Sequence, residues 1–201
     1  HRKTEGFEVR ILPEALSKEI VMGLFFNPGN TNFRVKRNDE YIDKSGLITE
    51  VNATLEKKDR LSCISRPRRF GKTYAAAMLV AYYDMSCDSH ELFDDLVIAK
   101  DPDYEKHLNK YNVMYLDMSY FISISKDRTR VVECTQKQLT DELVEMYPDI
   151  VNKDMTVSKA LETIVDTSGA QYIAIIDEWD APLRDSDATA KSKKEYLEFL
   201  R

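Results

Sequence analysis

Short apolar runs alternate along the chain with longer segments in which apolar residues recur at helical spacing. Three runs have the length of a strand: residues 61–65, 112–117 and 172–176. The last of them, Tyr-Ile-Ala-Ile-Ile, is continuously apolar. We therefore expect it to be covered on both faces, as in a parallel sheet flanked by helices.

Three longer segments have the pattern of helices. Residues 72–83 leave almost no polar face, which predicts a helix buried in the core. Residues 131–146 form a charged amphipathic segment that ends before Pro148, and residues 156–168 form another, with Gly169 as a helix stop. Because strands alternate with helices, the predicted fold class is α/β.

Composition and charge narrow the class of protein. The 201 residues, 43% apolar and 32% charged, suit one soluble globular domain. The net charge of −6 argues against a protein that coats nucleic acid, although a local basic patch is compatible with it. No apolar run approaches the ~20 residues that cross a bilayer. We expect a cytoplasmic protein without a membrane partner.

Neither the cysteines nor the histidines indicate a disulfide or a metal site. Cys63, Cys87 and Cys134 are far apart and odd in number, which favours free thiols in a reducing compartment. His90 and His107 have no cysteine or histidine at metal-ligand spacing, so we interpret both as ordinary surface residues.

The chain divides into three parts. Residues 1–21 precede Met22 and are interpreted as a translated leader or an N-terminal extension, with Met22 as the native start. Residues 22–60 form an N-terminal segment that contains the sequence Tyr-Ile-Asp-Lys-Ser at residues 41–45. Residues 61–201 form the core and end inside a helical pattern without a stop signal.

The segment between residues 61–65 and the apolar helix has the chemistry of a phosphate-binding loop. Gly71 lets the backbone approach phosphate oxygens, Lys72 supplies a charge for the β- and γ-phosphates, and Thr73 supplies a hydroxyl ligand for Mg²⁺. The amides and the dipole at the start of the helix attract the same anion. The predicted nucleotide-binding residues of this segment are Arg66, Pro67, Arg68, Arg69, Phe70, Gly71, Lys72 and Thr73.

This loop departs from the common pattern G-x-x-x-x-G-K-[ST] at Arg66, where glycine is usual. A surface turn is the alternative interpretation, but it leaves Arg68 and Arg69 unexplained. Pro67 fixes its own φ and stiffens the loop. We expect at least one of the three arginines to reach phosphate or an acidic partner; the alternative is that all three are solvated.

The apolar run at residues 172–176 ends in two carboxylates. Asp177 would hold Mg²⁺ through water, opposite Thr73, and Glu178 would orient and polarise an attacking water. Adjacent residues on a strand point to opposite faces, which supports separate roles. We predict Glu178 and Lys72 as catalytic residues, and Thr73 and Asp177 as metal ligands. The alternatives are a solvated strand end or, because the sequence continues Trp-Asp, a helicase box.

Three motifs together resemble the bacterial AAA-ATPase-like family. Residues 41–48, 65–73 and 175–180 are similar to its "YVDKT" box, its "SRPRRFGKS/T" loop and its "IDEYD/IDEWD" strand end. The resemblance covers nearly all of residues 22–201, and Arg66 is then the family's own form. It implies a P-loop three-layer αβα sandwich of the additional-strand type that binds ATP and Mg²⁺. Many members carry a restriction-endonuclease-like effector domain after the ATPase, through which nucleic acid is a possible partner.

The resemblance also suggests a role for the box at residues 41–45. In related ATPases the segment before the first core strand covers the adenine, so Tyr41 or Ile42 is expected near the base. Asp43 and Lys44 are expected to fix the turn into the next helix. A plain structural turn is the alternative.

In additional-strand ATPases, a later strand inserts between the Asp-Glu strand and the phosphate-loop strand. Residues 178–201 read as loop and helix and do not supply it. We therefore expect residues 61–65 and 172–176 each to have an open edge. Residues 1–201 alone are expected to be poorly soluble or inactive.

Three functions compete at this point. The first is an ATPase that drives or gates an effector domain, the second is a nucleotide-gated switch with little hydrolysis, and the third is a nucleic-acid motor. Glu178 favours the first over the second, because a pure sensor does not need a water-activating carboxylate. The net charge of −6 weakens the third.

Overall fold

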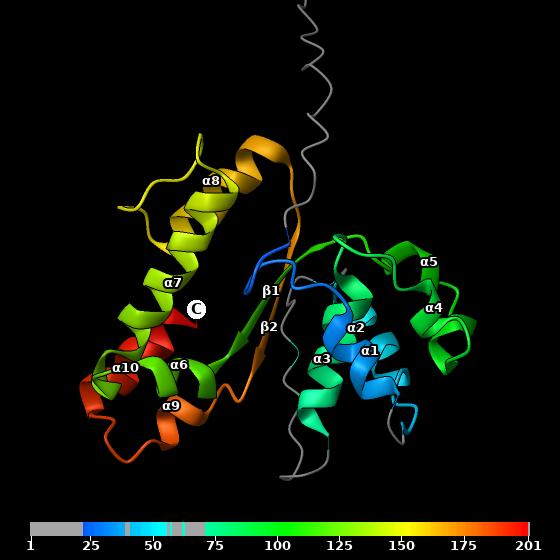
Figure 1. Cartoon of the computed structure of the whole chain (residues 1–201), viewed down its shortest axis with the longest axis horizontal. Coiled ribbons are helices and arrows are strands. Elements are labelled where there is room, and N and C mark those ends of the chain that lie inside the picture. Colours follow the sequence, from blue (N-terminus) through cyan, green and yellow to red (C-terminus); the bar gives the residue numbers. More distant parts are fainter. Residues whose placement is uncertain (1–21, 39–40, 56, 58–61, 63–70, 201) are drawn as a thin grey trace, which may run out of the picture.

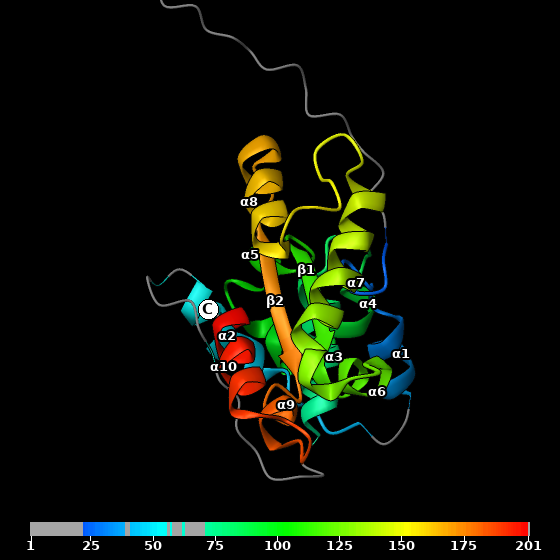
Figure 2. The ribbon, with the colours of Figure 1, turned by 90° about the vertical axis from the view of Figure 1, so that its left-hand side faces the viewer.

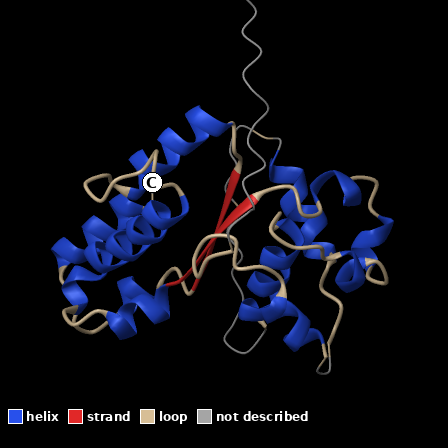
Figure 3. Ribbon diagram, turned by 45° about the horizontal axis from the view of Figure 1, so that its top comes forward, coloured by secondary structure: helices blue, strands red, loops and turns tan. Residues whose placement is uncertain are grey.

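The structure, a computed structural model, describes residues 22–38, 41–55, 57, 62 and 71–200. Two parallel strands, β1 (Asn112–Asp117) and β2 (Tyr172–Asp177), lie at its centre with helices on both sides (Figures 1 and 3). Both strands occupy residues that the apolar pattern predicts. The fold is α/β with a parallel pair of strands, as expected.

The helices form two groups on opposite sides of the strands (Figure 1). The first group contains α1 (Thr31–Arg37), α2 (Gly46–Leu55), α3 (Lys72–Tyr83), α4 (His90–Phe93), the 3-10 helix η1 (Val97–Lys100) and α5 (Tyr104–His107). The second group, which faces the viewer in Figure 2, contains α6 (Met118–Ile124), the 3-10 helix η2 (Arg128–Arg130), α7 (Val131–Met146), α8 (Val157–Ser168), α9 (Ala181–Arg184) and α10 (Ala190–Phe199). In the described part of the chain, no helix combines the length and apolarity that crossing a bilayer requires.

Alternate residues of each strand join two different apolar clusters. The residues that join the cluster of the first helix group are Val113, Tyr115, Ile173 and Ile175. The residues that join the cluster of the second group are Met114, Leu116, Tyr172 and Ile176. This period of two means that each helix group covers one face of the strand pair.

Strand β2 is nevertheless less buried than its continuous apolar sequence predicts. Ala174 is exposed, and the apolar residues on either side of it are only partly buried. On one edge β2 pairs with β1; on its other edge it has no strand partner among the described residues. The strand predicted at residues 61–65 lies outside the described residues except for Ser62, which is exposed and irregular.

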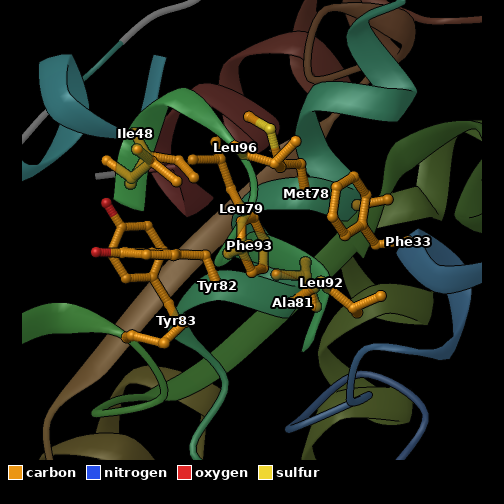
Figure 4. Close-up of a cluster of buried hydrophobic side chains, with 14 of the residues drawn as sticks. Phe33, Ile48, Met78, Leu79, Ala81, Tyr82, Tyr83, Leu92, Phe93 and Leu96 are labelled. Atoms are coloured by element: carbon orange, nitrogen blue, oxygen red, sulfur yellow. The ribbon is translucent and has the colours of Figure 1, made fainter. Parts of the chain in front are cut away.

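Helix α3 begins and ends where the pattern predicts and is the most deeply buried helix of the first group. Its residues from 76 to 83 are all buried. Figure 4 shows Tyr82 and Tyr83 in this cluster with Phe33 from α1 and Phe93 from α4. The Tyr83 hydroxyl donates to Asn52 Oδ1 on α2 (2.7 Å), so the buried phenol keeps a hydrogen-bond partner.

Helices α7 and α8 also agree with the sequence pattern to within one residue. Helix α8 begins after Thr156, whose side chain accepts a hydrogen bond from the Lys159 N–H (3.2 Å). It ends at Gly169, which has a φ of 68° and donates its N–H to the Val165 carbonyl (2.8 Å). The left-handed conformation at this position explains why glycine serves as the stop.

The two histidines differ from each other. The interpretation of His107 as a surface residue is wrong, because it is only 3% exposed and its Nδ1 lies 2.7 Å from the Tyr111 hydroxyl. The ring of Tyr111 also stacks against its imidazole. His90 is exposed, as expected. The cysteines within the described residues, Cys87 and Cys134, are free, also as expected.

A buried carboxylate ties the first turn of the described chain to the end of α3. Asp84 is fully buried, and its carboxylate accepts hydrogen bonds from the N–H groups of Gly29 (2.6 Å) and Ser86 (2.8 Å). The Asn109 side chain donates to the Asp84 carbonyl (2.6 Å). These contacts fix the C-terminal end of α3, which is the end farthest from Lys72.

We predict that Asp84→Ala lowers the free energy of unfolding by about 2–4 kcal/mol, because it leaves the buried N–H of Gly29 and the half-buried N–H of Ser86 without their acceptor. Denaturant unfolding measures the change. The matched control is Asp141→Ala on α7, which removes an exposed ion pair with Lys137 (3.0 Å) and is expected to cost less than about 1 kcal/mol. Equal losses in the two variants would contradict the role given to Asp84.

Candidate functional site

The start of α3 forms one wall of the candidate site. Gly71 lies in the left-handed region, with φ 75° and ψ 33°, directly before Lys72. Thr73, in the first turn of α3, is exposed, and Lys72 is partly exposed. The N–H groups of a first helical turn lack helical partners, and together with the helix dipole they attract an anion.

The predicted loop residues before Gly71 lie outside the described residues. They are Arg66, Pro67, Arg68, Arg69 and Phe70. Their expected contacts with phosphate or with an acidic partner stay predictions.

The acidic end of β2 forms the opposite wall. Asp177 is the last residue of the strand and is buried, with 7% of its surface exposed. Glu178 lies beyond the strand in a turn, with a φ of 49°, and its N–H donates to Asp177 Oδ1 (2.9 Å). The prediction that the two carboxylates alternate along one strand is therefore wrong. The turn, rather than the pleat, sets the direction of Glu178.

Two neighbouring helices hold this turn in place. The Glu178 carbonyl accepts a hydrogen bond from the N–H of Ala181, the first residue of α9 (2.8 Å). The hydroxyl of Tyr196 on α10 donates to the Trp179 carbonyl (2.6 Å), and Tyr196 is only 1% exposed. A left-handed residue with a Cβ costs about 1–2 kcal/mol, so such a turn persists only where its surroundings fix it.

The two walls meet at an ion pair. Lys72 Nζ, in the first turn of α3, lies 3.9 Å from Glu178 Oε1. Both side chains are about a third exposed, so the pair contributes little to stability. Its importance is positional, because it joins the two sequence motifs to which catalysis was assigned.

Arg184, on α9, also contacts Glu178, although it belongs to none of the three sequence motifs. Its Nη2 lies 3.0 Å from Glu178 Oε2, and its guanidinium also pairs with Asp180 through Nε (2.7 Å) and Nη2 (3.1 Å). The hydrogen bond from Arg184 lowers the pKa of Asp180, and the same bond raises the pKa of Arg184. The i, i+4 spacing of Asp180 and Arg184 was the available sequence signal.

A pocket of about 270 Å³ opens beside Gly71. Its lining residues are Tyr41, Ile42, Lys44, Gly71, Tyr74, Ala75 and Met78. The Tyr41 hydroxyl reaches the Met78 sulfur (3.5 Å), and burial raises the pKa of Tyr41. Ile42 is 75% exposed. The two residues predicted to lie near a nucleotide base thus share a pocket with Gly71.

The rest of the box at residues 41–45 shapes the same region. Asp43 accepts hydrogen bonds from the N–H groups of Ser45 (2.7 Å) and Val97 (2.8 Å), which confirms that it fixes the turn into α2. Lys44 contributes to the same turn, because its carbonyl accepts a hydrogen bond from the Leu47 N–H in the first turn of α2 (3.0 Å). The Lys44 Nζ lies 2.7 Å from the position that a Cβ on Gly71 would occupy, so a side chain at residue 71 would require this flexible lysine to shift.

The predicted metal ligands fit Mg²⁺ by their chemistry. Thr73 offers a hydroxyl and Asp177 a carboxylate, which are hard oxygen donors. No group of three or more His, Cys, Asp or Glu side chains in the described ranges could hold a metal ion by itself. Mg²⁺ commonly takes one or two protein ligands and completes its shell with water and substrate phosphates. A site built from these two residues would therefore depend on a bound phosphate.

The sequence of this chain matches a known protein family. The family model described as a predicted AAA-ATPase matches residues 29–201. The chain belongs to this AAA-ATPase-like family. The matched range includes the box at 41–45, the start of α3 and the acidic turn after β2. No curated protein and no solved structure gives a significant match. Membership of an AAA-ATPase-like family implies nucleotide binding and suggests ATPase activity.

The left-handed turn at Glu178 generates a prediction in which the usual order of two substitutions is reversed. Glu178→Gly relieves the backbone strain and Glu178→Ala keeps it, so the glycine variant should be more stable by about 0.5–1 kcal/mol. The control pair is Glu162→Gly and Glu162→Ala on α8, where alanine should be more stable by about 1 kcal/mol. Denaturant unfolding of the four variants tests the difference, and the same order at both positions would contradict it.

Proposed function

We propose that this chain binds ATP with Mg²⁺ and hydrolyses it, and that hydrolysis drives or gates an effector domain. The observation that carries the proposal is the approach of Lys72 to Glu178 across 3.9 Å. Lys72 is expected to bind the phosphates, and the carboxylate of Glu178 is expected to polarise the attacking water. A site that transfers phosphoryl groups to water needs both on one side of the molecule.

The roles of the remaining residues follow from this proposal. Gly71 and the first turn of α3 bind the β- and γ-phosphates together with Lys72. Thr73 and Asp177 hold Mg²⁺, which supplies charge for the phosphate oxygens when it is bound. Glu178 accepts a proton from the attacking water. The loop residues Arg66, Pro67, Arg68, Arg69 and Phe70 remain assigned to the nucleotide.

The pocket beside Gly71 is proposed to take the nucleotide base. Tyr41 and Tyr74 offer aromatic surface, Met78 offers a soft apolar contact, and exposed Ile42 stands at the pocket without being needed for the core. The positive group of Lys44 beside Gly71 suits the junction between base and phosphates. Because the pocket borders Gly71, a single nucleotide could place its base in the pocket and its phosphates at the start of α3.

The finer fold assignment is also a proposal. A P-loop sandwich of the additional-strand type has parallel strands between two helix layers, and the parallel β1–β2 pair between two helix groups supports it. The helicase alternative is weakened by the engagement of Asp180, whose carboxylate is paired with Arg184 through two hydrogen bonds. An effector domain of the nuclease type, and nucleic acid bound through it, are expected in the full-length protein from the resemblance alone.

The first experiment separates binding from chemistry in the full-length protein. ATP and Mg²⁺ at about 100 times Kd should add about 2.7 kcal/mol of stability, or roughly 5–10 °C in Tm for a domain of this size. Lys72→Ala should abolish the rise. Glu178→Gln should keep the rise but hydrolyse ATP at least about 100-fold more slowly, because a general base contributes about 10²–10⁴ in rate.

Each outcome has a separate meaning. A wild-type protein whose Tm does not rise with millimolar ATP and Mg²⁺ would overturn nucleotide binding. Binding without turnover in the wild type would favour the nucleotide-gated switch. Turnover that appears only with DNA would favour the nucleic-acid motor. Hydrolysis by Glu178→Gln at the wild-type rate would remove Glu178 from its catalytic role.

The second experiment tests the base pocket. Tyr41→Ala and Ile42→Ala should each lower ATP affinity, by about tenfold for the aromatic residue, since base–aromatic stacking contributes about 1–3 kcal/mol. Affinity for inorganic triphosphate should not change, because that ligand has no base. Val35→Ala removes a similarly exposed apolar side chain from α1 and should leave both affinities unchanged. Equal losses for ATP and triphosphate, or none for either, would favour the plain structural turn.

A further inference from the structure

The carboxylate of Glu178 is held between two cations, one at each oxygen. Oε1 faces Lys72 Nζ at 3.9 Å, and Oε2 accepts a hydrogen bond from Arg184 Nη2 at 3.0 Å. Lys72 belongs to the first turn of α3, whereas Arg184 follows Glu178 in the chain on α9. The two oxygens of one carboxylate are therefore distinguished by their surroundings.

Arg184 is itself fixed by a second carboxylate. Asp180 accepts from Arg184 Nε (2.7 Å) and Nη2 (3.1 Å), a two-point contact that sets the plane of the guanidinium. Two backbone hydrogen bonds hold the same residues together. The Arg184 N–H donates to the Asp180 carbonyl (3.1 Å), and the Ala181 N–H donates to the Glu178 carbonyl (2.8 Å). Glu178, Asp180 and Arg184 thus form one closed unit.

Such a unit has a direct chemical consequence. A carboxylate that accepts a proton from water must present one oxygen at a defined angle, and a misplacement of about 1 Å can cost about 100-fold in rate. A planar guanidinium orients a carboxylate better than an ammonium does, because its donors form a rigid fork. With Oε2 held by Arg184, the oxygen left toward the start of α3 is Oε1.

We propose that Arg184, anchored by Asp180, is a positioning residue that presents Glu178 Oε1 to the attacking water. The inference rests on the proposed ATPase function, because it assigns a task to Arg184 through Glu178. Phosphate entering beside Lys72 attracts the ammonium group, and the Arg184 bond then keeps Glu178 in place. Arg184 acts on the carboxylate and makes no contact with the nucleotide.

Three variants of the full-length protein test this assignment, with ATP hydrolysis and ATP affinity measured separately. Arg184→Met should lower kcat by about 10- to 100-fold and leave ATP affinity within about twofold. Arg184→Lys should recover only part of the loss, since an ammonium lacks the fork. Asp180→Asn should lower kcat in the same direction but less, because it loosens Arg184 without removing it.

Arg128→Met is the matched control for these variants. Arg128 is as exposed as Arg184 and pairs with Asp185, the residue immediately after Arg184, at 3.0 Å. Its loss therefore disturbs the same end of α9 without touching Glu178. Unchanged kcat in Arg128→Met supports the assignment, whereas an equal fall in both variants would show that only the stability of α9 matters.

A double-mutant cycle with Glu178→Gln gives the decisive readout. If Arg184 acts through Glu178, adding Arg184→Met to Glu178→Gln should cause no further fall in the single-turnover rate. A further fall, or weaker ATP binding in either background, would overturn the proposal in favour of direct contact with phosphate. Wild-type kcat in Arg184→Met would overturn it alone, while absence of hydrolysis in the wild type would overturn the proposed function itself.

Discussion

The parallel pairing of β1 with β2 is the constraint from which the site follows. Its register sets Asp117 opposite Asp177, so the carboxyl ends of both strands lie together and each ends in a carboxylate. In open parallel sheets, ligands bind beyond the carboxyl ends of the strands, because the loops that follow the strands converge there. The ion pair between Lys72 and Glu178 shows that the start of α3 also lies at the carboxyl ends of the strands.

Helix α3 has to be rigid at one end and accessible at the other, and its sequence separates the two requirements. Its second half is buried in the first apolar cluster, and Asp84, which follows its last residue, is hydrogen-bonded to the N–H groups of Gly29 and Ser86. Its first turn, with Lys72 and Thr73, has polar residues that remain accessible. Because the helix is held at its far end, the residues offered to a ligand need not contribute to the packing that holds them.

Patterns within one element were predictable from sequence, whereas most individual side-chain contacts between elements were not. The bounds of α3, α7 and α8 followed from apolar periodicity and, at Gly169, from the residue that tolerates a left-handed turn. The burial of His107 was missed because the sequence does not show that its ring stacks on Tyr111, four residues later. The approach of Lys44 to Gly71 was missed for the same reason, since it depends on how α2 and α3 pack.

Within the site, the sequence motifs correctly indicated that the start of α3 and the end of β2 lie together. The direction of Glu178, however, depends on its left-handed backbone conformation, which the sequence does not show. The segment Asp-Glu-Trp-Asp reads equally well as a continued strand or as a turn. Short helices such as α9 are similarly hidden, because four residues are too few for a periodic signal. The sequence therefore did not show that α9 brings the Arg184 side chain back to Glu178.

The left-handed turn at Glu178 interrupts the alternation of side chains along β2. Ile173 and Ile175 face the helix group that contains α3, and Ile176 faces the other group. If the strand continued, residue 178 would follow 176 and point away from α3. A φ of 49° breaks the alternation and directs Glu178 to Lys72 instead. The strain of this turn is thus the cost of bringing two successive carboxylates, Asp177 and Glu178, to the side on which α3 begins.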